Sequence, residues 1–143
     1  MFLGTEEYVN EAEKRINADV KYQELAQKVN DSYSLIFLPE PNKGVEKKLV
    51  LGFTIINGKM TEKWIGERPT SFIMSAPYGV YVDILIGKLN VNRAFISRKL
   101  KVKGPLPRLL KTARATERLV QVLGTIPTEF AGDYKDKNIT AKS

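Results

Sequence analysis

Apolar residues recur at helical spacing over the first 30 positions of the chain. Thr5 and the two glutamates after it are typical of the start of a helix. The apolar positions that follow are Tyr8, Val9, Ala12 and Ile16. This phase breaks at residues 17–19, and a second helical pattern then runs from Tyr22 to Val29. The pattern predicts two short helices joined by a tight corner.

The middle of the chain shows the alternation and the turn residues of β-strands. Residues 33–38 are apolar on both faces, which predicts a strand that is covered on both sides or flanks a cavity. Residues 49–55 alternate, and Asn57-Gly58 favours a hairpin turn into a return strand over residues 59–65. The fourth and fifth predicted strands are residues 71–74 and 98–104.

Helical spacing returns in the last third of the chain. A helix is predicted to begin near Ser75, and residues 90–96 fit one short helical turn. Gly104-Pro105 then opens a single long helix. The apolar positions on its inner face are Leu106, Leu109, Leu110, Ala113, Val120 and Leu123. The basic positions on its outer face are Arg108, Lys111, Arg114 and Arg118.

The order of these elements predicts an α+β fold with one domain over residues 1–131. Strands joined in sequence, with helices before and after them, favour this class over a doubly wound parallel sheet. Residues 132–143 are polar and lack apolar periodicity, so we expect them to form a flexible tail.

Two absences from the composition exclude most catalytic chemistry. The 143 residues include no cysteine and no histidine. No disulfide, thiolate nucleophile or Ser-His-Asp triad can therefore be built, and the usual zinc and iron sites are disfavoured. We expect a protein that is not an enzyme, with no cofactor and no metal. The N-terminus lacks the basic and apolar regions of a secretory signal, which predicts a cytoplasmic location.

Positive charge is concentrated in residues 87–118. This segment has ten Lys and Arg and one acidic residue, a balance of +9, whereas the rest of the chain has a balance of −2. Three interpretations fit it: a solvated surface with lysines along a sheet edge, a docking surface for anionic lipid or the phosphates of coenzyme A, and a nucleic-acid patch. The last is the least favoured, because single-strand binding needs aromatic platforms and the segment contains only Phe95.

Several segments together resemble the sterol carrier protein type 2 family, in its stand-alone prokaryotic branch. The most specific are GKLN at residues 87–90, AF at 94–95 and KLKVKG at 99–104, followed by an amphipathic helix. With NADVKYQELA, SAPYGVYVDILIGKL and IPTEF, the resemblance covers residues 5–130. Family members often have glycine before the KLK segment, where this chain has Arg98. The resemblance implies a five-stranded, mostly antiparallel sheet backed by helices, enclosing an apolar tunnel for fatty acids, fatty acyl-CoA, phospholipids or sterols.

The candidate site depends on this resemblance, because periodicity alone does not separate a tunnel from a filled core. The residues expected to line the tunnel are Phe72, Met74, Ile84, Phe95, Leu106, Leu109, Leu110 and Leu123. The residues expected to face an anionic headgroup or membrane surface are Arg108, Lys111, Arg114 and Arg118. The expected function is non-catalytic binding or transfer of a lipid such as a fatty acid or fatty acyl-CoA. The alternatives are an accessory subunit on an enzyme of lipid or isoprenoid metabolism and, more weakly, a nucleic-acid-binding protein.

Overall fold

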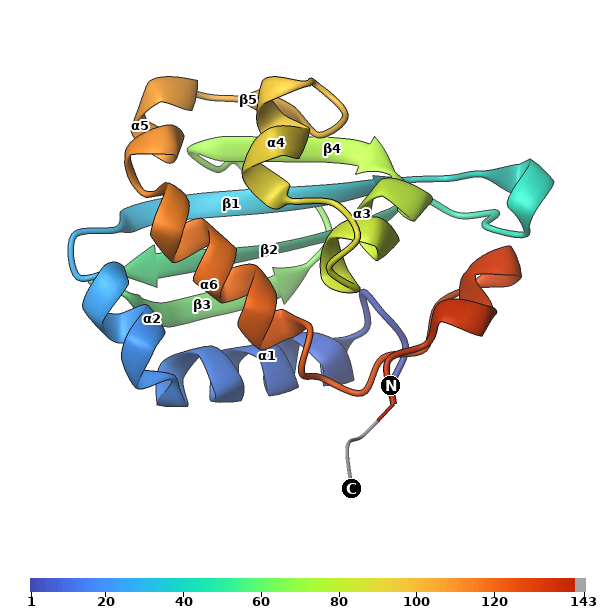
Figure 1. Ribbon diagram of the computed structural model, residues 1–143, viewed down its shortest axis with the longest axis horizontal. Coiled ribbons are helices and arrows are strands. Elements are labelled where there is room, and N and C mark those ends of the chain that lie inside the picture. Colours follow the sequence, from blue (N-terminus) through green and yellow to red (C-terminus); the bar gives the residue numbers. More distant parts are fainter. Residues whose placement is uncertain (141–143) are drawn as a thin grey trace.

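The computed structural model describes residues 1–140, in which helices pack on a five-stranded sheet (Figure 1). The strands are β1 (Asn30–Leu38), β2 (Leu49–Ile56), β3 (Lys59–Ile65), β4 (Phe72–Pro77) and β5 (Lys101–Lys103). The α-helices are α1 (Glu6–Ala18), α2 (Val20–Leu25), α3 (Tyr78–Leu85), α4 (Val91–Ile96), α5 (Leu106–Lys111) and α6 (Ala113–Leu123). Two 3₁₀-helices complete the set: η1 (Pro41–Lys43) and η2 (Gly132–Lys137).

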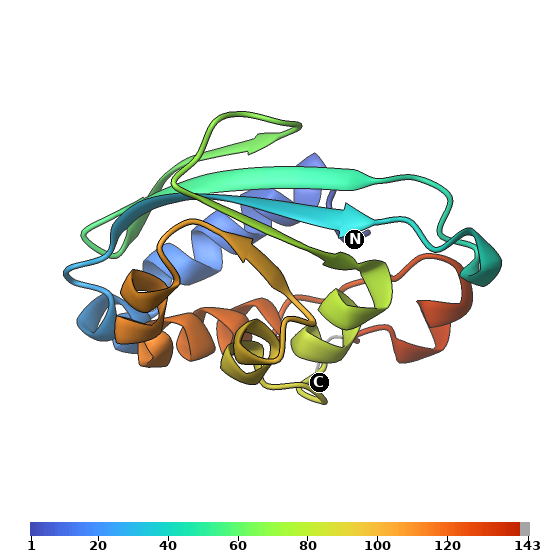
Figure 2. The same cartoon turned by 90° about the horizontal axis from the view of Figure 1, so that it is seen from above.

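The strand order is β3-β2-β1-β4-β5, and β1 and β4 are the parallel pair. The other three pairings are antiparallel, so the prediction of an α+β fold with a mostly antiparallel sheet is confirmed. Figure 2 shows α3 to α6 gathered on one side of this sheet. The side chains that point to that side, such as Tyr33 of β1, Phe53 of β2 and Phe72 of β4, are buried and stacked on one another.

The other side of the sheet is crossed by the connection from β3 to β4. Because β3 and β4 lie on opposite sides of the β1–β2 pair, residues 66–71 must pass over the sheet. The hydroxyl of Ser34 donates to the carbonyl of Arg68 at 3.3 Å, which fastens this connection to β1. Trp64 lies flat against Gly52, where an added Cβ would come within 2.4 Å of its ring. The Arg68 guanidinium covers the Trp64 ring at 4.6 Å.

The predicted N-terminal corner is confirmed, and one residue makes it. Asp19 follows the last residue of α1 and precedes the first residue of α2. Its extended backbone ends the first helix, and its carboxylate accepts a hydrogen bond from the Tyr22 amide at 2.9 Å to cap the second. Thr5 caps α1 in the same way, as predicted.

The last helix differs from its prediction as a single element. α5 ends at Lys111 and α6 begins at Ala113, with the Thr112 backbone at φ −109° and ψ 31°. The Thr112 hydroxyl donates to the Leu109 carbonyl at 3.0 Å, a local bond of the kind that competes with regular helix. In Figure 1, α5 lies beside one end of β5, and after the bend α6 runs across the sheet. Ser75 differs as well: it lies within β4, and α3 begins at Tyr78.

The segment after residue 131 differs from the expected flexible tail as far as residue 140. Residues 132–137 form η2, and the Tyr134 side chain in it is only 8% exposed. The Tyr134 hydroxyl donates to the Glu40 carboxylate at 3.0 Å, and its ring packs on that of Tyr78. A single aromatic side chain thus anchors a polar segment. Residues 141–143 of the expected tail lie outside the described residues. Within residues 1–140, no helix has the length and apolar character required to cross a bilayer.

Candidate functional site

An apolar cavity of about 110 Å³ lies between the sheet and the helices. Side chains from β1 to β4 and from all six α-helices line it. On the sheet side, Tyr33, Leu35 and Phe37 of β1 point into the cavity. Ser34 and Ile36 alternate with them and face the crossing connection. The first strand therefore flanks a cavity on one side and packs under a loop on the other, which accounts for its two apolar faces.

Five of the eight side chains expected to line a tunnel border this cavity. They are Met74, Ile84, Phe95, Leu109 and Leu123. Phe72 does not: its ring is fully buried, packed against Tyr33 on one side and covered by the Arg108 guanidinium at 5.2 Å. Leu106 and Leu110 are half-buried on α5, outside the cavity wall. A role for the five in binding a ligand stays a prediction.

Helix α1 contributes a wall of the cavity that the sequence did not single out. Its lining residues are Tyr8, Val9, Ala12 and Ile16. The sequence showed their helical spacing, but the same spacing is produced by residues of a filled core. The N-terminal part of α6 adds Ala115 and Leu119 in the same way.

Most polar groups in the lining already have partners in the protein. The Lys63 ammonium pairs with the Glu13 carboxylate at 3.0 Å. The Tyr81 hydroxyl donates to the Met74 carbonyl at 2.7 Å, and burial raises the pKa of Tyr81 above its usual value. Within residues 1–140, no three His, Cys, Asp or Glu side chains gather as metal ligands would. The cavity offers apolar burial rather than acid–base or metal chemistry.

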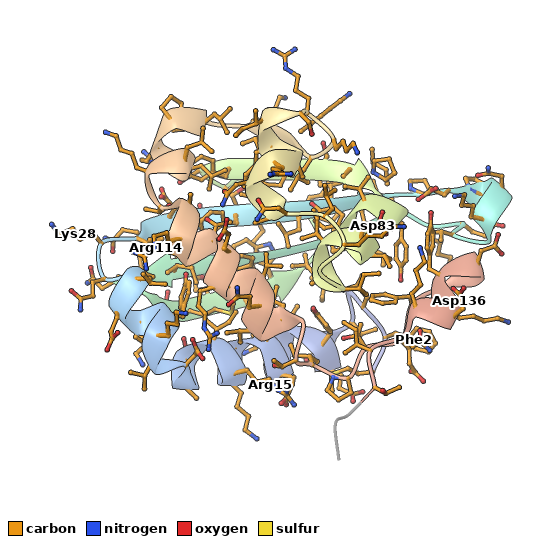
Figure 3. The ribbon with its side chains drawn as sticks, in the orientation of Figure 1. Phe2, Arg15, Lys28, Asp83, Arg114 and Asp136 are labelled. Carbon is orange, nitrogen blue, oxygen red and sulfur yellow. The ribbon has the colours of Figure 1, made fainter. Side chains whose placement is uncertain are left out.

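The four basic residues expected to face an anionic headgroup divide into two kinds. The Arg118 guanidinium binds both carboxylate oxygens of Asp19, at 2.7 and 2.8 Å, and this hydrogen bonding lowers the pKa of Asp19. Arg108 pairs with Asp31 at 2.6 Å. Lys111 and Arg114 are exposed and have no acidic side chain within 4.0 Å among residues 1–140. Figure 3 shows Arg114 near the start of α6.

Exposed cations also lie on α4, on β5, in the turns beside them and at the end of α5. We call the following set the basic edge: Arg93, Arg98, Lys99, Lys101, Lys103 and Lys111. All six are exposed, and residues 84–116 contain no acidic residue. The Ile96 side chain lies among them and is 69% exposed. In Figure 1, α4, β5 and α5 follow one another along the β5 side of the sheet.

An α+β fold with an apolar cavity under its helices is typical of proteins that bind apolar molecules. The sequence matches the model of the SCP-2 sterol transfer family over residues 9–117. The chain belongs to this family, as the sequence segments predicted. Lipid binding or transfer is the general function of the family.

Solved structures share the fold over most of the chain. A crystal structure of sterol carrier protein 2 superimposes with a TM-score of 0.80 at 24% identity, covering 87% of this chain and 98% of the other. A conserved hypothetical protein from Thermus thermophilus gives 0.78 at 24% identity, covering 87% and 89%. Palmitated SCP2L2 from Aedes aegypti gives 0.53 at 14% identity, covering 78% and 93%. No curated protein matches the sequence.

Proposed function

We propose that the protein is a non-catalytic lipid carrier that holds a long-chain acyl lipid, a fatty acid or the acyl part of fatty acyl-CoA, in the apolar cavity. The observation that carries this proposal is the cavity itself, whose lining is mostly apolar. The fold neighbour from Aedes aegypti, which is palmitated, supports an acyl chain as the ligand. We propose the cytoplasm as the compartment in which the protein binds its lipid.

The driving force for binding would be burial of the chain. Each methylene removed from water contributes about 0.8 kcal/mol, so 16 carbons offer on the order of 10 kcal/mol before the costs of association. A purely apolar wall discriminates one methylene by only about 1–3 kcal/mol, so selectivity among chain lengths would be modest.

The wall must move to admit such a chain. At about 110 Å³ the cavity is smaller than an apolar cavity of about 150 Å³ that accommodates benzene. Helix α5 is the element best placed to move. Leu109 is its one buried residue, and non-helical backbone at Pro105 and Thr112 bounds it at both ends. The Arg108–Asp31 pair holds α5 to the start of β1 in the closed form.

Chain-length dependence tests the carrier proposal. Delipidated protein should bind a fluorescent fatty acid near one to one, and unlabelled fatty acids of 8 to 16 carbons should displace it with rising affinity. An affinity that is flat across this series would show that burial does not drive binding, and the carrier proposal would fail.

We also propose that the basic edge is the surface that meets an anionic membrane. Each Lys or Arg near such a surface contributes about 1 kcal/mol, and Ile96 is placed to enter the headgroup region among these cations. The elements that carry the basic edge also supply cavity wall on their inner side, through Phe95, Leu100 and Leu109. Docking by this edge would therefore bring the movable part of the wall to the lipid.

Vesicle binding at low salt tests this surface. The double variant Lys99→Glu with Lys101→Glu should weaken association with vesicles that contain phosphatidylserine, while leaving fatty-acid affinity unchanged. Wild-type association should fade as added salt shortens the Debye length below about 10 Å. If wild type ignores these vesicles, the basic edge is a solvated surface. Binding to single-stranded oligonucleotides without lipid affinity would favour the nucleic-acid alternative.

A further inference from the structure

One hydroxyl in the cavity wall is fully buried and unpaired within the part of the chain that the structure describes. Tyr8 of α1 lines the cavity and is only 3% exposed. Its hydroxyl is fully buried and has no hydrogen-bond partner among the protein atoms of residues 1–140. Among the residues that line the cavity, it is the only fully buried polar side-chain atom in this condition within that part of the chain.

Three other hydroxyls in the lining have hydrogen-bond partners. The hydroxyl of Tyr81 donates to a carbonyl, and those of Thr112 and Thr116 donate to carbonyls of their own helices. An unpaired buried hydroxyl is costly, and most buried polar groups in folded proteins are paired. A phenylalanine at position 8 would bury the same ring without this cost, so the hydroxyl has no structural benefit of its own in the unliganded fold.

The chemistry of the site restricts what can bind this hydroxyl. The lining has one cationic side chain, Lys63, and Glu13 already neutralises it. An ionised carboxylate near Tyr8 would therefore be buried without a counter-charge, which is strongly unfavourable. Burial, with a smaller contribution from Tyr78, raises the pKa of Tyr8 far above its usual value, so the hydroxyl keeps its proton. It is suited to a neutral oxygen, as a donor to it or an acceptor from it.

We propose that Tyr8 is a specificity-determining residue that selects lipids carrying a neutral hydroxyl or carbonyl oxygen on the part that enters the cavity. A long-chain alcohol or a chain with an in-chain hydroxyl or keto group belongs to this class. An unsubstituted chain buries the same apolar area but leaves the Tyr8 hydroxyl unpaired. This inference rests on the proposed lipid-carrier function and adds a polar subsite to it.

The test compares two ligands of similar length in three proteins. 1-Dodecanol and 1-chlorododecane compete for a bound fluorescent fatty acid in wild type, in Tyr8→Phe and in Tyr78→Phe. A hydrogen bond of ordinary strength should make the preference of wild type for the alcohol about threefold to tenfold greater than that of Tyr8→Phe. Tyr78→Phe is the matched control, because Tyr78 lies outside the cavity lining and its hydroxyl is already paired with the Ala131 amide, so it should keep the wild-type preference.

Two further measurements separate a ligand role from a structural one. Without ligand, Tyr8→Phe should melt at or above the wild-type temperature, whereas Tyr78→Phe should melt lower because the Ala131 amide loses its hydrogen-bond acceptor. With dodecanol labelled with ¹³C at carbon 1, NMR should show contacts between that carbon and the Tyr8 ring. An equal alcohol preference in wild type and Tyr8→Phe, or the lack of any contact between carbon 1 and the Tyr8 ring, would overturn the inference while leaving the carrier function intact. Loss of all displacement in wild type would overturn the carrier function itself.

Discussion

Replacing Arg118 by alanine should lower stability without weakening membrane association. The sequence placed Arg118 with the residues that face an anionic surface, but its guanidinium is bound side-on to Asp19, 99 positions away. The same carboxylate caps α2 through the Tyr22 amide. The pair thus joins the corner between α1 and α2 to the middle of α6, and holds one wall of the cavity to another.

The expected loss follows from the geometry of this pair. Its two hydrogen bonds are 2.7 and 2.8 Å long, and its side chains are 28% and 18% exposed. Fully exposed ion pairs contribute about 0–1 kcal/mol, whereas breaking a buried one costs about 3–5 kcal/mol. For this half-buried, bidentate pair we expect about 1–2 kcal/mol, discounted for solvent screening. That corresponds to a fall in Tm of about 3–8 °C for a chain of this size.

Urea denaturation of wild type, Arg118→Ala and the matched control Arg114→Ala measures this loss. Arg114 lies on the same helix, is exposed and has no acidic partner in the described part of the chain, so its removal should change stability by less than about 0.5 kcal/mol. The contribution of the pair also depends on pH. Because the pKa of Asp19 is lowered in the folded state, this stability is present above the unfolded pKa of about 3.9 and is lost as pH falls through the lower, folded pKa.

Two outcomes would refute this reasoning. One is a free energy of unfolding for Arg118→Ala equal to that of Arg114→Ala, which would mean that the pair contributes nothing to stability. The other is a loss of affinity for anionic vesicles in Arg118→Ala as large as in Lys99→Glu with Lys101→Glu. That result would show that Arg118 leaves Asp19 to meet lipid, as the sequence alone suggested.

Three further predictions concern single elements. Leu109→Glu should lower the free energy of unfolding by about 3 kcal/mol or more in urea titrations and abolish fatty-acid binding at any salt, because it puts an unpaired charge in the cavity wall; unchanged binding would place Leu109 outside the site. Arg98 has φ 63°, which glycine adopts with less strain than other residues. Arg98→Gly should therefore raise the free energy of unfolding by up to about 1 kcal/mol in the same titrations, whereas Arg98→Ala should not raise it. Ending the chain after residue 131 removes the contacts of Tyr134, so about 1 kcal/mol or more of burial and hydrogen bonding is lost. The Tm measured by differential scanning calorimetry should fall by more than about 3 °C. An unchanged Tm would support the interpretation of this segment as a flexible tail.

Local chemistry determined most of the elements, which is why the sequence predicted them. The corner at Asp19 combines the end of one helix with a capping side chain for the next, and both are properties of neighbouring residues. The hairpin turn at Asn57 and Gly58 has φ values of 48° and 82°, which these two residue types adopt with little strain. Arg98, where family members often have glycine, also has a local explanation. Its backbone takes the left-handed conformation that glycine favours.

Contacts between distant segments decided the site, and periodicity does not report them. A helical repeat of apolar residues shows which face is buried, but not whether atoms or open space lie opposite it. For that reason α1 lines the cavity although its sequence pattern predicted only a helix. Phe72, which was expected to line the cavity, is instead buried beneath the Arg108 guanidinium. The pairing of Arg118 with Asp19 and of Tyr134 with Glu40 likewise joins residues more than 90 positions apart. From the sequence alone, Arg118 was assigned to a surface and Tyr134 to a flexible tail. Their partners come close to them only when the helices pack on the sheet.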